Sequence, residues 1–350
     1  MPFLPANSII PPRSTLYAII FIHMIINGES FTASNTRTFT KRQTLYKLPL
    51  HAVPEGTFRP FASYAWDKLI ASGLVEENST LVPNHLATNS VKGNTEGSTI
   101  NIEVKSTSST DKESSLPSLR MARYALLESL IPSSNGMISS PNGIHVLNLV
   151  LFPDTQLPLP VLGMDLVSLP GNNHLIAIDF QPIISFDNSK GNDDGDNDNG
   201  SDIDSPLFPP QFAKDEQRIK RLHEKHVLEQ IEILPWGGDI PKEAERFFSR
   251  YALWTRLKGE GALLTIQSKV YDAFCDYLDL YLEIMSEARD LDENVNVSEK
   301  SNFDLDEIQQ GHTDYLNYRR DNDPARPMLT RLYGENYTEE LISEVLFKLV

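Results

Sequence analysis

The chain has 350 residues, a formal net charge of −17 and a single cysteine, Cys275. At about 150 residues per domain, this length allows one large domain or two ordinary ones. A lone cysteine excludes an internal disulfide and any multi-cysteine zinc or iron–sulfur site, and it is typical of a reducing compartment. The acidic balance argues against non-specific binding of nucleic acid, which requires a basic surface.

Most of the negative charge is concentrated in two short stretches. Residues 187–204 contain seven Asp and one Lys, and residues 287–307 contain eight acidic and two basic side chains. Each stretch therefore carries a net charge of −6, which leaves −5 for the rest of the chain. We expect both to be flexible spacers outside the core, since the first in particular is low in complexity and too polar to bury.

Residues 1–54 have the features of a targeting presequence. An apolar run at 16–26 follows Arg13; it is too short to span a bilayer comfortably but fits the apolar region of a signal peptide. From Ser30 to Pro54 the chain has four basic residues and no acidic one, which is typical of a transit peptide. The pair predicts import into a complex plastid, the chloroplast stroma, and no stable membrane span in the mature protein. The alternative is an ordinary secretory signal on a secreted binding protein.

Beyond the presequence, the first expected element is a helix over 58–75, where apolar residues recur at helical spacing. Residues 86–117 are rich in Ser, Thr and Asn and are expected to be a flexible loop. Three apolar segments with turn residues between them then predict strands at 144–152, 161–169 and 174–183, with a weaker fourth strand within 120–127. Connections this short exclude crossover helices and predict an antiparallel meander.

After residue 204 the pattern becomes helical. Helices are expected at 211–230, 241–248, 263–289, 306–320, 324–333 and 337–348, the last with Asn336 and Glu339 as its cap. Both faces of the strand at 161–169 are apolar, so the sheet needs a layer on each side. The expected fold is a three-layer α/β/α sandwich with a central antiparallel sheet, in a single domain over 55–350.

Two aspartates are candidate acids. Asp165 lies in the middle of a strand, where loss of hydration favours the protonated carboxyl, and the alternative is a structural pair with a buried arginine. Gly163, on the same face, leaves room for a ligand to approach the backbone. Asp323 precedes Pro324 and a helical run, so it is expected to cap that helix, and a capping carboxylate can also face a pocket.

A buried amide is expected at Asn148, on one face of the strand at 144–152, and it needs a backbone or ligand partner. His145 has the opposite parity and is expected to be a core or surface histidine. The sequence has no glycine-rich phosphate-binding loop and no serine-hydrolase elbow, which removes the easily recognised nucleotide-binding and serine-hydrolase functions.

Several motifs, taken in order, resemble the ferredoxin-dependent bilin reductases. They are LPVLGMD at 159–165, IDFQP at 178–182, LPWGG at 234–238, LWTR at 253–256, DYLDLYLE at 276–283 and DPAR at 323–326. The similarity covers about 118–186 and 206–350, and the ordered set is specific although no single motif decides.

The resemblance implies an oxidoreductase with no bound cofactor, free of flavin and metal, that holds an open-chain tetrapyrrole between the sheet and the C-terminal helices. Reduced ferredoxin would supply electrons singly, and carboxylates would supply protons through radical intermediates. The family's two aspartates correspond to Asp165 and Asp323, which makes both catalytic candidates. Asn148, Arg256 and Arg326 are candidate substrate contacts.

Within the family, the WGG, LWTR and DYLDLY motifs are most similar to the members that form phycoerythrobilin from 15,16-dihydrobiliverdin by reducing its A-ring diene. The phytochromobilin synthases share parts of this pattern and reduce biliverdin, and a bilin carrier without catalysis is a further alternative. Asn148 stands where the phycocyanobilin-forming members have a histidine, which argues against their chemistry. Pro327 replaces a glycine, and a proline at the fourth helical position is expected to shift Asp323.

The partners that the resemblance implies are ferredoxin, the bilin and a preceding bilin reductase or heme oxygenase. Ferredoxins of this kind are acidic, so a basic patch is expected to bind them. The candidates for that patch, or for binding the bilin propionates, are Arg319, Arg320, Arg326 and Arg331.

Overall fold

The computed structural model describes residues 56–75, 81–108, 119–155, 157–184, 206–240, 242–294 and 305–348. The expected presequence at 1–54 and the acidic stretch at 187–204 lie outside the described residues.

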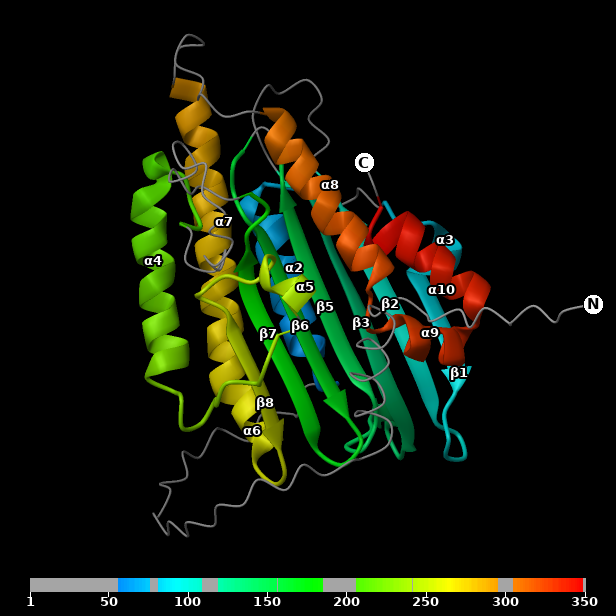
Figure 1. The fold of residues 1–350 in the computed structure, drawn as a ribbon. Coiled ribbons are helices and arrows are strands. Elements are labelled where there is room, and N and C mark those ends of the chain that lie inside the picture. The colour runs from blue at the N-terminus through cyan, green and yellow to red at the C-terminus, as the bar shows by residue number, and fades with distance from the viewer. Residues whose placement is uncertain are drawn as a thin grey trace, which may run out of the picture.

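An antiparallel sheet of eight strands forms the centre of the fold (Figure 1). Its strands are neighbours in the order β1-β2-β3-β5-β6-β7-β8, and β4 pairs with the end of β3. Their bounds are β1 Thr88–Lys92, β2 Thr99–Thr107, β3 Leu119–Ser133, β4 Gly136–Ser139, β5 His145–Pro153, β6 Val161–Leu169, β7 Asn173–Gln181 and β8 Leu253–Lys258. Every pairing is antiparallel, as the short connections predict.

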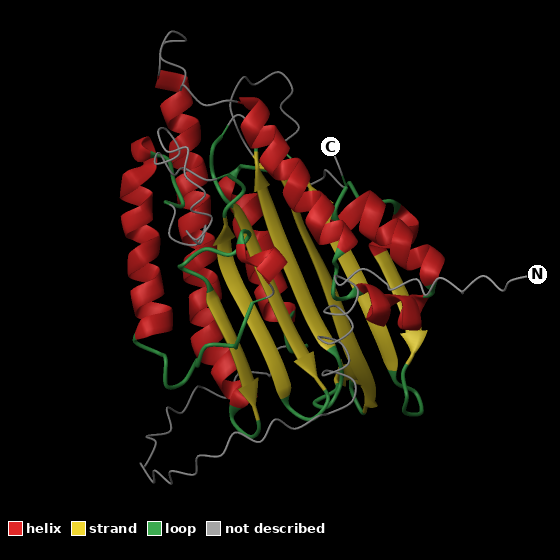
Figure 2. Cartoon of the chain, viewed as in Figure 1, coloured by secondary structure: helices red, strands yellow, loops and turns green. Residues whose placement is uncertain are grey.

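Helices cover both faces of the sheet (Figure 2). One face packs against α2 (Arg59–Ser72), α4 (Ala213–His223) and α7 (Tyr271–Asn294). The other packs against α8 (Leu305–Asp321), α9 (Arg326–Tyr333) and α10 (Glu335–Leu341). Shorter helical segments are α3 (Asn84–Ala87), η3 (Pro210–Phe212), η4 (Glu224–Leu228), α5 (Lys242–Glu245), α6 (Ala262–Thr265), η5 (Ile266–Val270) and η7 (Ile342–Leu346). The predicted α/β/α sandwich is confirmed.

Alternate residues of the central strands enter two separate cores, which explains why both faces of β6 are apolar. Leu162, Met164 and Leu166 belong to the core beneath α2 and α7. Val161 points the other way and joins the core beneath α8 and η7. Asp165 has the parity of Val161, so it faces the C-terminal helices.

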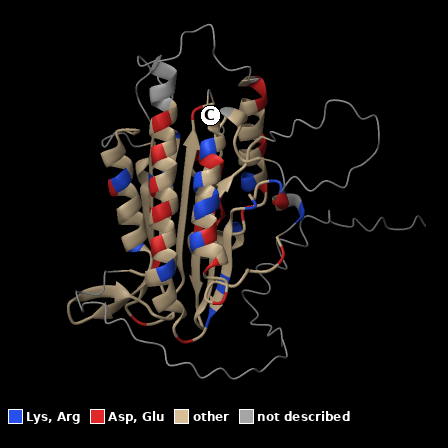
Figure 3. Ribbon diagram, turned by 90° about the vertical axis from the view of Figure 1, so that its left-hand side faces the viewer, with Lys and Arg blue, Asp and Glu red and all other residues tan. Residues whose placement is uncertain are grey.

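Helix α7 contributes aromatic residues to the first core and acidic residues to its outer side. Tyr277 and Tyr281 are buried, and the Tyr281 hydroxyl donates to the carbonyl of Pro160 at 3.0 Å. The acidic side runs next to the basic helix α4, with ion pairs such as Lys214–Glu287 at 2.6 Å (Figure 3). The aromatic stripe is therefore core, as expected, and much of the charge on α4 is paired.

One of the expected flexible segments was wrong, and another is only partly described. Residues 86–117 were expected to be a loop, but they contain β1 and β2, which extend the sheet beyond β3. The polar residues of β2 alternate with Ile100, Ile102 and Val104, which pack on the core. In the acidic stretch at 287–307, which was expected to be a spacer, α7 continues to Asn294 and α8 begins at Leu305, and residues 295–304 lie outside the described residues.

Two expectations about the last helices were also wrong: that the last helix starts at residue 337, and that Pro327 is at the fourth position of its helix. Helix α10 begins after Gly334, whose φ of 86° ends α9, and no side chain caps it. Pro327 is the second residue of α9, where its missing N–H has no intrahelical acceptor to lose. This proline therefore starts the helix without disturbing it.

Candidate functional site

Three polar side chains lie next to one another on the sheet face that looks toward α8, α9 and η7. Asn148 on β5 is directly opposite Asp165 on β6, and Arg123 comes from β3 on the same face. Arg123 is fully buried, whereas the carboxylate of Asp165 keeps 29% of its exposure. A charged array at the middle of an apolar sheet needs partners for each member.

The three side chains form one hydrogen-bonded chain. The Arg123 Nη1 donates to Asn148 Oδ1 at 2.5 Å, and Asn148 Nδ2 donates to Asp165 Oδ1. Arg123 Nε also donates to the carbonyl of Leu346 in η7, at 2.9 Å. The amide of Asn148 therefore has partners on both sides, which are side chains and not backbone.

Helix α8 completes the array with a second arginine. Arg319 Nη2 donates to Asp165 Oδ2 at 3.2 Å, so each oxygen of Asp165 accepts a hydrogen bond. Burial works against the charged form of Arg319, but the combined effect of Asp165, Tyr315 and Asp323 raises the pKa of Arg319 above its usual value.

Asp323 lies between α8 and α9 and uses its two oxygens differently. Oδ1 accepts from the backbone N–H of Ala325 at 2.9 Å, while Oδ2 is buried and has no hydrogen-bond partner among the described residues. Burial raises the pKa of Asp323, against the opposing effects of the Ala325 amide and Arg319. Asp323 therefore stabilises the turn before α9 through one carboxyl oxygen. Its charge also acts to raise the pKa of Arg123 and of Arg319, which places it close to the array.

The two aspartates have opposite environments. Asp165 is held by a donor on each oxygen, whereas Asp323 has one donor and is desolvated. Burial thus favours the acid form of Asp323, the carboxyl that has the single donor. Apolar side chains that are only partly buried lie on the same sheet face or on the helix opposite: Val146, Val167, Leu175 and Met328.

The other candidate arginines lie at different places. Arg256 is exposed on β8, on the same sheet face, and its guanidinium stacks over the ring of Trp254 at 5.4 Å. Arg326 pairs with Glu339 and donates to the carbonyl of Arg320, so it connects α9 to α10 and to the end of α8. The structure thus brings Asn148, Asp165 and Asp323 together, whereas Arg326 bonds to Glu339 and to the carbonyl of Arg320.

The space at Gly163 is filled by the protein. A Cβ at this position would lie 2.4 Å from Oε1 of Gln181, and the hydroxyl of Tyr315 donates to that same oxygen. The expected ligand approach at Gly163 is therefore wrong. Next to Gln181 on β7, buried Asp179 accepts from the Ser249 N–H at 2.8 Å and from its hydroxyl at 2.5 Å.

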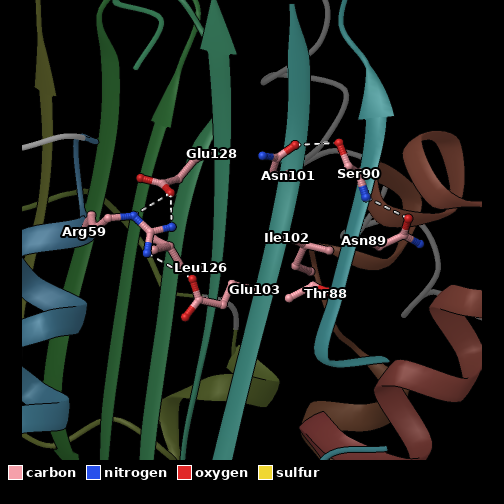
Figure 4. A pocket seen from close by; sticks show the side chains of 9 residues that line it. All are labelled: Arg59, Thr88, Asn89, Ser90, Asn101, Ile102, Glu103, Leu126 and Glu128. Carbon is pink, nitrogen blue, oxygen red and sulfur yellow. Dashed lines mark hydrogen bonds and ion pairs between the residues drawn. The ribbon is translucent and has the colours of Figure 1, made fainter. Parts of the chain in front are cut away.

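A pocket of about 430 Å³ lies on the opposite face of the sheet (Figure 4). Arg59 of α2 reaches across it to Glu103 at 3.0 Å and to the buried Glu128. At the other side of the pocket, Asn101 accepts from the Ser90 hydroxyl at 2.7 Å. This pocket is separated from Asp165 by the sheet, and its charges are already paired.

The described residues contain no cluster of three or more His, Cys, Asp or Glu side chains able to hold a metal ion. Among the same residues, no helix is long and apolar enough to cross a membrane.

Sequence reasoning missed Arg123 and assigned Arg319 to a ferredoxin or propionate contact. Arg123 lies in the weakest of the predicted strands, and its partner carbonyl at Leu346 is far away in the chain. The short sequence distance between Arg319 and Asp323 was a usable signal, because Arg319 lies in the last turn of α8 and Asp323 follows two residues after its end.

Comparison with known proteins agrees with the motifs. The family model described as ferredoxin-dependent bilin reductase matches residues 136–193 and 205–348. The chain is 38% identical over 211 residues to the phycoerythrobilin:ferredoxin oxidoreductase of Prochlorococcus marinus (strain AS9601), which covers 60% of this chain and 69% of that protein. For the protein of the same name from Nostoc punctiforme, identity is 37% over 212 residues, covering 61% and 69%.

The fold has a counterpart among solved structures. The phytochromobilin synthase from tomato, crystallised in complex with biliverdin, matches with a TM-score of 0.55 at 20% identity, covering 83% of this chain and 82% of that one. The family model matches more than half of this chain, and the relatives are matched over about two thirds of their own length. The chain belongs to the ferredoxin-dependent bilin reductases and is an oxidoreductase.

Proposed function

We propose that this enzyme reduces the A-ring diene of 15,16-dihydrobiliverdin to phycoerythrobilin, with electrons from reduced ferredoxin and a proton from Asp323. The observation that carries the proposal is the contrast between Asp323, whose Oδ2 is buried and unpartnered among the described residues, and Asp165, which accepts on both oxygens. The name that the relatives share contains phycoerythrobilin and ferredoxin, which supports the choice of product and of electron donor.

The reaction needs two electrons and two protons for each diene. Two reduced ferredoxins each give up one electron, and the electrons and protons end as two new C–H bonds across the conjugated system. A proton donor is effective when its acid form is present at the working pH. The raised pKa of Asp323 favours that acid form.

Asp165 has a different task. As a carboxylate fixed by Asn148 and Arg319, it can accept hydrogen bonds from pyrrole N–H groups and balance positive charge on a protonated bilin. Asp323 is partly exposed as a residue, so solvent can return its proton after transfer.

We also propose that the enzyme works in a plastid, where residues 1–54 would direct it. The support is the apolar run followed by an acid-free stretch. A fluorescent fusion of residues 1–54 tests this: signal in the plastid supports the proposal, and secretion contradicts it.

Turnover under anaerobic conditions with reduced ferredoxin tests the reaction. Wild type is expected to convert 15,16-dihydrobiliverdin to phycoerythrobilin, identified by chromatography, in preference to biliverdin. Preferred reduction of biliverdin would instead indicate phytochromobilin-synthase-like chemistry. A colour change on binding with no reduction of either bilin would indicate a carrier.

The Asp323→Asn variant tests the proton donor. We expect turnover to fall about 100-fold or more while the bilin still binds, because a positioned acid typically contributes a factor of that size. Asp321→Asn is the matched control, since Asp321 lies two residues away with 67% of its side chain exposed. Unchanged turnover in Asp323→Asn would refute the role.

A further inference from the structure

We propose that Phe347 is a positioning residue of the site: its ring holds the guanidinium group of Arg319 on Asp165. The inference deepens the proposed function and rests on it, because the same contact keeps Arg319 away from Asp323, the proposed proton donor. It stands on a ring that packs against two cations and on two buried polar atoms that have no hydrogen-bond partner among the described residues.

Phe347 comes from the turn that ends the described chain. It directly follows η7, and only 2% of the residue is exposed. Its backbone N–H donates to the carbonyl of Ile342 at 2.9 Å, with the five-residue spacing of a π-turn. One residue earlier, the carbonyl of Leu346 accepts from Nε of Arg123 at 2.9 Å. The ring therefore enters the core at a fixed place, next to the array on the sheet.

Two cations lie over this one ring. The guanidinium carbon of Arg123 is 5.2 Å from the ring centroid of Phe347, and that of Arg319 is 5.5 Å from it. An arginine within about 6 Å of an aromatic face is attracted by the negative charge of that face, most strongly where water is excluded. Burial, followed by the repulsion of Arg319, lowers the pKa of Arg123 to about 10. The ring thus offsets a repulsion between two largely buried cations.

Arg319 depends on the ring more than Arg123 does. Arg123 donates to the Leu346 carbonyl and to Asn148, and these two bonds fix its orientation without the ring. Among the described residues, Arg319 makes one hydrogen bond, from Nη2 to Asp165 Oδ2 at 3.2 Å, and its buried Nε has no partner. A guanidinium has five N–H donors, so one bond of that length leaves its orientation poorly defined. Contact with the ring supplies a second constraint.

Asp323 is the competing partner for Arg319. Its Oδ2 is buried without a hydrogen-bond partner among the described residues, and its charge attracts the Arg319 guanidinium. If Arg319 turned from Asp165 to this oxygen, it would form an ion pair with Asp323, and an ion pair favours the carboxylate over the acid. By keeping the guanidinium over its face, Phe347 leaves Asp323 able to donate its proton.

The first measurement uses the ligand-free protein and needs neither bilin nor ferredoxin. Phenylalanines that carry one, two, three and five fluorine atoms replace Phe347, since fluorine removes the negative charge of the ring face and nearly keeps the ring's shape. The melting temperature is expected to fall along the series, by about 3 °C in total. The slope is expected to be smaller in Arg319→Met and in Arg123→Met, because each removes one of the two cations.

The same fluorine series at Phe152 is the control for packing and hydrophobicity. This ring is buried in the same core, and in the described part of the chain its ring contacts are His312 and Tyr315, not an arginine or lysine. A slope at Phe347 no steeper than at Phe152, or one that is unchanged in Arg319→Met, would overturn the proposal. If Arg319→Met does not fold, Arg319→Gln serves in its place.

The second measurement is turnover with reduced ferredoxin across the Phe347 series. We expect kcat to fall about tenfold from phenylalanine to its pentafluoro form while KM for the bilin changes little, because the proton donor is captured and the binding surface is kept. A kcat that does not follow the series would refute the positioning role. The substrate is whichever of 15,16-dihydrobiliverdin and biliverdin the wild type reduces. If it reduces neither, the proposed function fails, and the melting series still decides whether the ring holds the two cations.

Discussion

The buried His312 makes the stability of the protein depend on pH in a defined window. It lies on α8 with 0% exposure, 5.9 Å from the ring of Phe152, and neither ring nitrogen has a hydrogen-bond partner among the described residues. Burial, reinforced by the nearby Arg120, lowers the pKa of His312 from 6.5 to about 3. The folded protein therefore holds this imidazole neutral where the unfolded chain protonates it.

The sign and size of the effect follow from proton linkage. Between about pH 6.5 and pH 3 the unfolded state binds one more proton at His312, so the free energy of unfolding falls as the pH falls. Each pH unit is worth about 1.4 kcal/mol, so lowering the pH from about 6.5 to about 4 costs about 3 kcal/mol. Above about pH 6.5 the imidazole is neutral in both the folded and the unfolded state, so His312 no longer makes the free energy of unfolding depend on pH.

Replacing His312 with leucine removes this dependence. We expect the stability of His312→Leu relative to wild type to rise by about 3 kcal/mol as the pH falls over that range. Urea denaturation followed by circular dichroism, at half-unit steps of pH, measures it. Leu316→Ala is the control, because it opens a cavity on the same helix and should shift the curve by a constant. A constant difference for His312→Leu as well would refute the reasoning.

Two other substitutions probe the sheet next to the site, and a third probes the pocket on the opposite face. Burial raises the pKa of Asp179 to about 7, so the folded protein holds a proton on Asp179 that the unfolded chain releases above pH 3.8. The free energy of unfolding therefore falls as the pH rises from 3.8 to about 7. In the same urea series, the stability of Asp179→Asn relative to wild type should rise by about 1.4 kcal/mol for each pH unit over that range. Gly163→Ala should lower stability by about 1–3 kcal/mol in thermal melts, since the new methyl group meets the buried Gln181; an unchanged melting temperature would contradict that contact. Arg59→Met should cost about 2 kcal/mol, because Glu128 is buried, and Arg59→Met with Glu128→Gln should recover part of the loss.

The sequence was sufficient for the architecture where hydrophobic periodicity was strong. The strands around Asn148 and Asp165 were placed to within a residue or two, since both faces of a central strand must be apolar. Strand β2 was missed although Ile100, Ile102 and Val104 alternate in it, because the surrounding Ser and Thr residues suggested a loop. Counting alternation over single strands would have found it.

Only part of the candidate site could be predicted from the sequence. Parity placed Asp165 and Asn148 on one face, and the proline after Asp323 indicated its turn. The role of Arg123 depends on a carbonyl contributed by η7, and no local pattern encodes such a partner. The filling of Gly163 by Gln181 is likewise a matter of cross-strand packing.

The contact between Arg123 and Leu346 also has a consequence for biosynthesis. The two residues are 223 positions apart, so a nascent chain exposes β3 long before the carbonyl that Arg123 requires has been synthesised. At about 5–20 residues per second, a ribosome takes roughly 10–45 s to cover that interval. During this time the sheet can form but the array around Asp165 cannot close, and the buried arginine has to remain hydrated. In nascent chains stalled behind an added C-terminal linker, bilin should therefore bind in its final mode only when the linker is long enough to bring residue 346 out of the exit tunnel.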